Sequence, residues 1–171
     1  MNQSRKTCRW GVLGAASIAR KNVRAMHLAE NAQPLAIASR TLEKASAFAA
    51  EHQVERSYGS YEALLEDPDV DAVYIPLPTT LHREWTIRAA AAGKHVLCEK
   101  PVAPNASDAE AMIESCRDAD VQFMDGVMFM HHARMQTLKS RLVDIGEAPN
   151  LITSGFSFRG DDSFFEENIR G

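Results

Sequence analysis

Three small residues near the start of the chain, Gly14, Ala16 and Ala19, follow the spacing G-x-G-x-x-G/A between an apolar run and a helix-like segment. In such a turn the first glycine allows a sharp bend, the second small residue lets a pyrophosphate approach the backbone, and the third lets helix and strand pack closely. The N-terminus of the following helix adds free N–H groups and a partial positive charge. The pattern predicts a dinucleotide-phosphate site, although its second glycine is Ala16. The alternative is a turn that holds no ligand.

The residues after the second apolar run indicate which dinucleotide would bind. NAD sites place a carboxylate there to accept hydrogen bonds from the ribose hydroxyls. This run instead ends in Ser39 and Arg40, and Lys44 follows one helical turn later. A hydroxyl and a guanidinium suit a 2′-phosphate, which needs donors and positive charge. The sequence therefore predicts NADP over NAD, unless Arg40 and Lys44 are solvated surface charges.

The tripeptide Glu99-Lys100-Pro101 follows another apolar run, His95–Cys98. If that run is a parallel strand, Lys100 lies at its carboxyl end, where ligands of open α/β sheets bind. A cation there can polarise a substrate hydroxyl or carbonyl and stabilise an oxyanion while a hydride moves. Pro101 fixes its φ angle and lacks an N–H donor, so it holds the chain's exit from the strand. The alternative is that Glu99 and Lys100 form an ordinary exposed ion pair.

Alternating strand-like and helix-like segments must position these residues. The predicted strands are Arg9–Leu13, Leu35–Ser39, a weak strand at Tyr58, Asp71–Ile75, His95–Cys98 and Val121–Asp125. The predicted helices are Ser17–Glu30, Thr41–Glu51, Ser60–Glu66, Leu81–Ala92, a helix from the capping box Ser107–Glu110 to about Ala119, and His132–Asp144. This alternation predicts, over residues 8–126, an α/β fold of the Rossmann type, a doubly wound parallel sheet with helices on both faces.

Residues 1–126 are therefore predicted to form an NAD(P)-binding Rossmann domain. We expect residues 127–171 to form a linker helix and the first strand of an incomplete, truncated α+β C-terminal domain for substrate binding and oligomerisation. In the segment 150–159 apolar and polar residues alternate, as in a half-buried antiparallel strand. Because no later strand of this chain would pair with it, we expect this segment to pair with another copy, to fold back or to be disordered.

The composition excludes several classes of protein. The chain has 171 residues, 45% of them hydrophobic and 25% charged, which is typical of a globular domain. Its net charge of −4 argues against a protein that works mainly by neutralising the phosphates of nucleic acid. No apolar run approaches the roughly 20 residues of a membrane span, and the first residues lack the apolar core of a signal peptide. We therefore expect a cytoplasmic protein that binds neither nucleic acid nor membranes.

Cysteine and histidine positions give no indication of a metal site. Cys8, Cys98 and Cys116 lack the spacing of metal ligands and are predicted to be buried thiols of a reducing compartment. His131 and His132 are adjacent, so they cannot share one face of a regular element. The sequence therefore predicts that no metal is bound.

Three motifs together resemble one enzyme family. The first turn, the segment from Ile75 to His82 and the segment Val96-Leu97-Cys98-Glu99-Lys100-Pro101 occur in the order found in the glucose–fructose oxidoreductase / inositol dehydrogenase / rhizopine catabolism family, usually called Gfo/Idh/MocA. The likeness covers roughly residues 7–160. The turn and Val127–Arg134 are most similar to the branch of dimeric dihydrodiol dehydrogenase and glucose–fructose oxidoreductase.

The resemblance implies a role for individual residues. It places the pyrophosphate against Gly14, Ala15, Ala16, Ser17 and Ile18. It places the adenosine ribose and its phosphate near Ser39, Arg40, Lys44 and Tyr58. It places the adenine side and the nicotinamide ribose beside Pro76, Leu77 and His82, and the nicotinamide end near Met128, His131 and Arg134. Lys100 is implied to be the active-site lysine, and Glu99 is implied to act beside it, both in catalysis and in contact with the cofactor.

The family also implies an activity. It implies an NADP-dependent oxidoreductase that transfers a hydride between nicotinamide and a hydroxyl or carbonyl carbon of a sugar, polyol or diol, working as a homodimer or larger homo-oligomer. Family members are roughly twice as long, so we expect this chain to be an N-terminal part with little or no activity by itself. The alternative is a non-catalytic dinucleotide-binding module that senses redox state or joins a partner subunit. A second domain encoded in frame after residue 171 would favour the enzyme. A Rossmann domain for coenzyme A or S-adenosylmethionine is disfavoured by Glu99-Lys100-Pro101.

Overall fold

The computed structural model describes residues 7–142, 144, 153 and 155. The chain divides into two units, with the division between Met128 and Phe129. The predicted strand at 150–159 lies outside the described residues, apart from two isolated positions, and so remains a prediction, as does the predicted boundary at residue 126.

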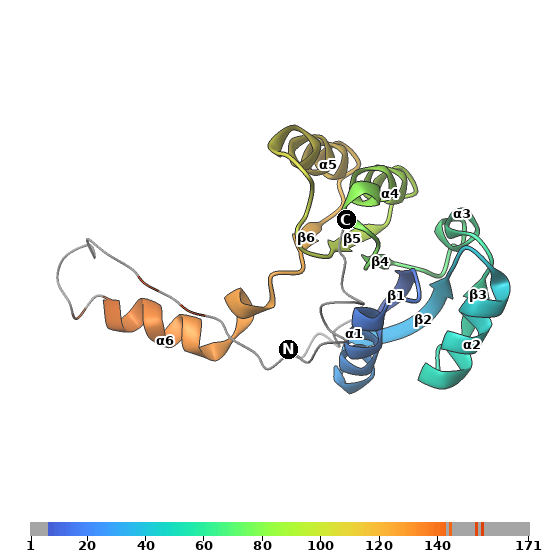
Figure 1. Cartoon of the computed structure of the whole chain (residues 1–171), viewed down its shortest axis with the longest axis horizontal. Helices are drawn as coiled ribbons and strands as arrows, with labels where there is room; N and C mark the ends of the chain where they lie inside the picture. The colour runs from blue at the N-terminus through green and yellow to red at the C-terminus, as the bar shows by residue number, and fades with distance from the viewer. Residues whose placement is uncertain (1–6, 143, 145–152, 154, 156–171) are drawn as a thin grey trace, which may run out of the picture. The chain divides into compact units, whose positions relative to one another are not determined.

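The first unit contains a six-stranded sheet in the order β3-β2-β1-β4-β5-β6 (Figure 1). Its strands are β1 (Cys8–Leu13), β2 (Ala32–Ala38), β3 (Arg56–Tyr58), β4 (Ala72–Ile75), β5 (His95–Cys98) and β6 (Phe123–Asp125). Its helices are α1 (Ser17–Leu28), α2 (Leu42–His52), α3 (Tyr61–Leu65), α4 (Thr79–Ala91) and α5 (Ala106–Asp118). Every strand pairing is parallel, and the direction of winding reverses between β1 and β4. The predicted doubly wound sheet is confirmed.

Helices cover both faces of this sheet (Figure 1). On one face Val12, Ile37 and Tyr74 pack against α1 and α2. On the other face Leu13 and Ile75 pack against α3, α4 and α5. Because successive side chains of a strand point to opposite faces, a strand covered on both sides must be apolar at every position. This explains why β4, whose four residues are all buried, shows no polar alternation.

One predicted helix start is wrong by two residues. The N-cap of α5 is Asn105, whose Oδ1 accepts a hydrogen bond of 2.9 Å from the amide of Asp108. The Asn105 side chain also donates to Asp108 Oδ2 at 2.9 Å. Asparagine serves as an N-cap as well as serine does, so the helix begins before the predicted cap at Ser107. The glycine predicted to follow α4, Gly93, does so with a φ of +70°.

A 3₁₀ turn (Met128–His131) begins at the last residue of the first unit and continues into the second. The second unit also contains α6 (Ala133–Leu142). The helix confirms the prediction for 132–144 in type and position.

Charged residues link the amino ends of the strands. The Arg56 guanidinium donates two hydrogen bonds to Asp67, at 2.9 and 3.0 Å, and a third to Asp69 at 2.9 Å. The Arg9 guanidinium donates to Asp69 and Asp71, each at 2.9 Å. Arg9 lies near the start of β1 and Arg56 begins β3, whereas the aspartates lie in the loop between α3 and β4. This network therefore fixes that loop at the amino edge of the sheet.

Loss of this network should destabilise the protein in acid. Burial alone would raise the pKa of Asp67, but hydrogen bonds from the Asp69 amide, Arg56 and Tyr58 outweigh burial and lower the pKa below its ordinary 3.8. A lowered folded-state pKa stabilises the protein above the ordinary value, and this stabilisation disappears as the pH falls through the folded-state value. We expect the urea midpoint to be nearly constant from pH 7 to 5 and to fall below about pH 4.

The variant Asp67→Asn tests this source. At pH 7 it should lower the free energy of unfolding by about 2 kcal/mol, because Arg56 loses its buried counter-ion. Its acid loss should be smaller than that of the wild type. Parallel loss of stability in both proteins would show that the network is not the cause.

Candidate cofactor and active site

The carboxyl ends of the strands bring most of the predicted site residues to one edge of the sheet. Backbone hydrogen bonds fix the first residue after each of three strands: Gly14 N donates to Ala38 O at 2.9 Å, Ser39 N to Tyr58 O at 3.1 Å, and Glu99 N to Ile75 O at 3.1 Å. The edge includes the switch point between β1 and β4, where a crevice opens in sheets of this type. The loops that were predicted separately therefore form one site.

The turn after β1 is shaped for close approach. Gly14 has a φ of +116°, and a Cβ added there would lie 2.9 Å from Leu77 Cδ2. Glycine is thus required at residue 14 both by conformation and by space. Ala16 is the N-cap of α1 in an extended conformation that any residue adopts, which explains why the second small position tolerates alanine.

The start of α1 has the properties of an anion site. No side chain caps this helix, and its first turn contains no acidic residue. The amide groups of Ser17 and Ile18 are therefore not satisfied by a capping side chain. Together with the positive end of the helix dipole, they can bind a phosphate.

Two exposed cations follow β2. Ser39 is buried at the strand's end, whereas Arg40 and Lys44 are exposed. Neither cation has an ion-pair partner among residues 7–142, although that part of the chain contains many ion pairs. Thr41 caps α2 by accepting a hydrogen bond from the Lys44 amide at 3.4 Å. Arg40 and Lys44 thus lie on either side of a helix start, with charges available to a ligand.

The two tyrosines near β3 differ in the direction of their hydroxyls. Tyr58 Oη donates to Asp67 Oδ2 at 2.8 Å and so belongs to the network that Arg9 and Arg56 form with the aspartates. Its predicted place beside the adenosine remains a prediction. Tyr61 was missed by sequence reasoning, yet its Oη lies 3.9 Å from the position of a Cβ on Gly14. The only signal in the sequence was its place just after the helix cap Ser60.

Glu99 is buried, so the alternative of an exposed ion pair is wrong. Its side chain accepts from Tyr74 Oη at 2.7 Å and from the Lys100 amide at 3.1 Å. Burial and the hydrogen bond to Glu99 both raise the pKa of Tyr74, whereas the Asn22 side chain acts in the opposite direction. Gly126 packs so closely that an added Cβ would lie 3.2 Å from Glu99 Cα. Glu99 therefore positions the backbone of Lys100, and its predicted part in catalysis and cofactor binding remains a prediction.

Lys100 itself is exposed, and its Nζ has no ion-pair partner in the described part of the chain. Its backbone is held by the hydrogen bond from its amide to Glu99 Oε2, and a cis peptide bond joins it to Pro101. A fixed backbone with a free ammonium group at the carboxyl edge can donate hydrogen bonds to an oxygen of a bound molecule.

The His82 ring contacts the loop after β4 and the loop after β5. Its ring is buried, with Nε2 at 2.7 Å from Leu77 O and Nδ1 at 3.1 Å from both Pro101 O and Val102 O. Both ring nitrogens are therefore used by the backbone. Pro76 is buried and Leu77 is half-buried beside Gly14, so His82 holds the loop that borders the crevice.

Three predicted residues lie at or beyond the division between the units. Met128 is exposed at the end of the first unit, whereas His131 of the 3₁₀ turn and Arg134 of α6 belong to the second. Their predicted place near the nicotinamide remains a prediction.

The described residues also bear on the predictions about metal and membrane. They contain no group of three or more potential metal ligands, and none of their helices is long and apolar enough to span a membrane. Cys98 and Cys116 are buried as predicted, and burial raises the pKa of Cys98 to about 12.

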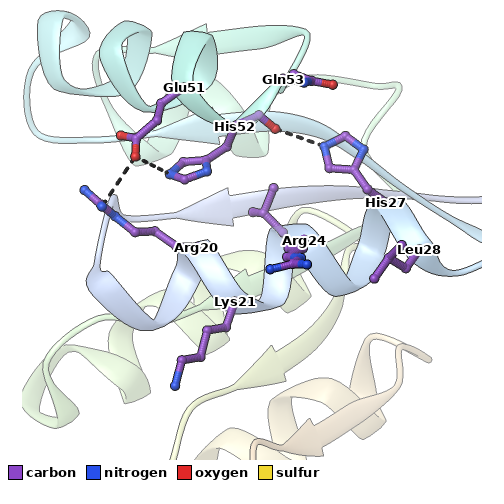
Figure 2. Close-up of a pocket in the computed structure, with 9 residues that line it drawn as sticks. Arg20, Lys21, Arg24, His27, Leu28, Glu51, His52 and Gln53 are labelled. Atoms are coloured by element: carbon purple, nitrogen blue, oxygen red, sulfur yellow. Dashed lines mark hydrogen bonds and ion pairs between the residues drawn. The ribbon is translucent and has the colours of Figure 1, made fainter.

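A separate groove lies between α1 and the end of α2, with a volume of about 430 Å³ (Figure 2). Arg20 pairs with Glu51 at 3.4 Å, and His27 Nε2 lies 3.0 Å from the His52 carbonyl oxygen. Lys21 points away from α2 in Figure 2. None of the predicted site residues lines this groove, so it is distinct from the carboxyl edge.

Known proteins similar to this chain are oxidoreductases. Residues 8–127 match the family described as "Oxidoreductase family, NAD-binding Rossmann fold". D-xylose 1-dehydrogenase (NADP(+)) 2 of Haloferax volcanii is 42% identical over 166 residues, which cover 95% of this chain and 51% of that protein. Trans-1,2-dihydrobenzene-1,2-diol dehydrogenase of Xenopus tropicalis is 39% identical over 68% of this chain and 36% of its own length. The chain thus spans about half the length, or less, of these relatives.

Solved structures show the same likeness. A 3-ketoreductase from Actinomadura kijaniata, crystallised with NADP, is 38% identical with a TM-score of 0.76, over 81% of this chain and 44% of its own. A probable dehydrogenase from Thermotoga maritima is 32% identical with a TM-score of 0.73, over 80% of this chain and 41% of its own.

The buried Tyr74–Glu99 hydrogen bond can be measured by a double-mutant cycle. Tyr74→Phe should lower the free energy of unfolding by about 2 kcal/mol, because a buried carboxylate oxygen loses its donor. Glu99→Gln should cost less in the Tyr74→Phe background than in the wild type, with a coupling energy of at least about 0.5 kcal/mol in urea unfolding. Additive effects would mean that the two side chains do not depend on each other.

Proposed function

Because the chain belongs to the Gfo/Idh/MocA oxidoreductase family, with its NAD-binding Rossmann fold, we propose that it binds NADP at the carboxyl edge of its sheet. We propose further that it contributes this site to an enzyme that transfers a hydride between nicotinamide and a hydroxyl or carbonyl carbon of a sugar, polyol or diol. The observation that carries the proposal is the start of α1, which follows the Gly14 turn and is not capped by any side chain. The turn itself has no room for a side chain, because a Cβ on Gly14 would lie 2.9 Å from Leu77.

The residues of the edge fit this cofactor. Uncapped amides at the start of α1 suit the pyrophosphate, and the absence of a side chain at Gly14 leaves the backbone open to it. Arg40 and Lys44 can supply charge and donors to a 2′-phosphate, and no carboxylate stands at the end of β2 to select an unphosphorylated ribose. The Haloferax relative is named for NADP(+), and the Actinomadura structure contains NADP.

Lys100 is the residue that would act on the substrate. Bound nicotinamide supplies or accepts the hydride. The Lys100 ammonium can donate a hydrogen bond to the substrate oxygen and stabilise the negative charge that develops there. Glu99 keeps the Lys100 backbone in place through the 3.1 Å hydrogen bond, and so acts as a positioning residue.

The substrate class rests on the names of the relatives. One acts on D-xylose and another on a dihydrobenzene diol. Both names describe substrates with hydroxyl groups, to which the Lys100 ammonium can donate a hydrogen bond. We propose a polyhydroxylated substrate of this kind for the whole protein.

The preference for NADP is tested by Arg40→Ala. Loss of a charge-assisted hydrogen bond to the 2′-phosphate should weaken NADPH binding about tenfold, whereas NADH binding should change less than about twofold. The matched control is Arg24→Ala, since Arg24 is also exposed on the first unit but lines the groove of Figure 2. Titration by calorimetry or nicotinamide fluorescence measures both cofactors. An unchanged NADPH-to-NADH ratio in Arg40→Ala would contradict the assignment.

The role of Lys100 is tested by Lys100→Met. In the whole protein, oxidation of D-xylose and of diols with NADP should slow at least about 100-fold in kcat, because the donor to the developing oxyanion is lost. NADPH affinity should stay within about twofold, since the pyrophosphate and 2′-phosphate contacts lie elsewhere. A whole wild-type protein that binds NADPH but transfers no hydride to any member of a sugar and diol panel would favour the non-catalytic module instead.

A further inference from the structure

Tyr61 occupies a fixed position at the cofactor edge. It is the first residue of α3, and Ser60 caps that helix by accepting from the Ala63 amide at 3.2 Å. The Tyr61 ring packs edge-on against Trp85 of α4, with centroids 4.8 Å apart and an interplanar angle of 81°. Since Trp85 is buried in the core, the Tyr61 ring cannot turn freely, and its hydroxyl is held in one place.

That place is beside the glycine turn. Tyr61 Oη lies 3.9 Å from the position that a Cβ on Gly14 would occupy. It is thus a neighbour of the turn at which α1 begins. Residue 14 has no side chain, so nothing belonging to that residue stands between the hydroxyl and the space in front of the turn.

The hydroxyl of Tyr61 differs from those of the other tyrosines. Tyr58 donates to Asp67 at 2.8 Å, and Tyr74 donates to Glu99 at 2.7 Å. No hydrogen bond of the Tyr61 hydroxyl occurs within the described residues, although the ring is half-buried. The hydroxyl is not among the buried polar atoms that lack a partner, so it reaches solvent at this edge. It is therefore a donor that an oxygen of a bound molecule can use.

The electrostatic surroundings favour an anionic partner. Burial raises the pKa of Tyr61 above its ordinary value, while the charge of Arg40 acts in the opposite direction. The group is therefore a neutral O–H donor at physiological pH, and Arg40 is near enough to influence it. A neutral donor between a guanidinium and an uncapped helix start suits an acceptor that carries negative charge.

We propose that Tyr61 binds a phosphate oxygen in the adenosine half of NADP, donating its hydroxyl hydrogen from beside the Gly14 turn. This assignment rests on the proposed function, because it requires that NADP bind at this edge. It adds a ligand that neither the glycine turn nor the end of β2 provides. The pyrophosphate and the 2′-phosphate present the same chemistry to this hydroxyl, and the experiment distinguishes them.

The test compares Tyr61→Phe with Tyr58→Phe. Each variant removes one hydroxyl and keeps the ring, and the two positions lie three residues apart at the ends of β3 and its connection to α3. Calorimetric titrations with NADPH, NADH and 2′,5′-ADP give the affinities, and urea unfolding confirms that each variant is folded. The structure assigns the Tyr58 hydroxyl to Asp67. We therefore expect Tyr58→Phe to lower the urea midpoint more than Tyr61→Phe does, and to lower NADPH affinity less.

For Tyr61→Phe we expect NADPH to bind about tenfold more weakly, with a nearly unchanged urea midpoint. Weaker binding of NADPH and 2′,5′-ADP with unchanged NADH would assign the hydroxyl to the 2′-phosphate. Equal weakening of NADPH and NADH would assign it to the pyrophosphate. Wild-type affinity of folded Tyr61→Phe for all three would overturn the inference and leave the proposed function standing. Failure of the wild-type chain itself to bind NADPH would overturn the proposed function.

Discussion

A carboxylate buried at the end of β5 must find partners, and the arrangement around Lys100 depends on those it finds. Burying an ionised group without hydrogen bonds costs several kcal/mol. Glu99 is only 7% exposed, and it is satisfied by the hydroxyl of Tyr74 from β4 and the amide of Lys100. One buried carboxylate thereby links the central strand β4 to the backbone of Lys100. It also explains why an otherwise apolar strand contains a tyrosine, and Gly126 packs so closely against it that an added Cβ would lie 3.2 Å from Glu99 atoms.

The two edges of the sheet use charge in opposite ways. At the amino edge the guanidinium groups of Arg9 and Arg56 form salt bridges with aspartates, so their charges are paired within the protein. At the carboxyl edge Arg40, Lys44 and Lys100 have no ion-pair partner within the described residues. A chain with a net charge of −4 therefore carries three unpaired cations, among its described residues, at the edge of the sheet where parallel strands end and helices begin. Bound phosphate would take the place that aspartates take at the other edge.

Sequence reasoning located the elements because their signals are local. Fully apolar runs marked the buried strands, and the glycine turn marked the first crossover; both depend on residues within a few positions of one another. It failed where a partner lies far away in the sequence. For Glu99 the sequence left open the alternative of an exposed ion pair with its neighbour Lys100, and it could not show the main side-chain partner, Tyr74, which is distant along the chain. At α5 it chose Ser107 over Asn105, since two good capping residues stand close together and only the backbone decides between them.

The tyrosines show the same limit most sharply. Tyr58 and Tyr61 lie three residues apart, and composition cannot say which hydroxyl faces the crevice. The register of β3 against β2 decides where the Tyr58 hydroxyl lies. Tyr58 pairs opposite Ala38 in the sheet, so its side chain lies on one face and its hydroxyl reaches Asp67 below. Tyr61 follows the loop and begins a helix, so its ring can pack on Trp85 at the carboxyl edge with its hydroxyl toward Gly14. The end of β3 thus separates the tyrosine that holds Asp67 from the one that we propose to bind the cofactor.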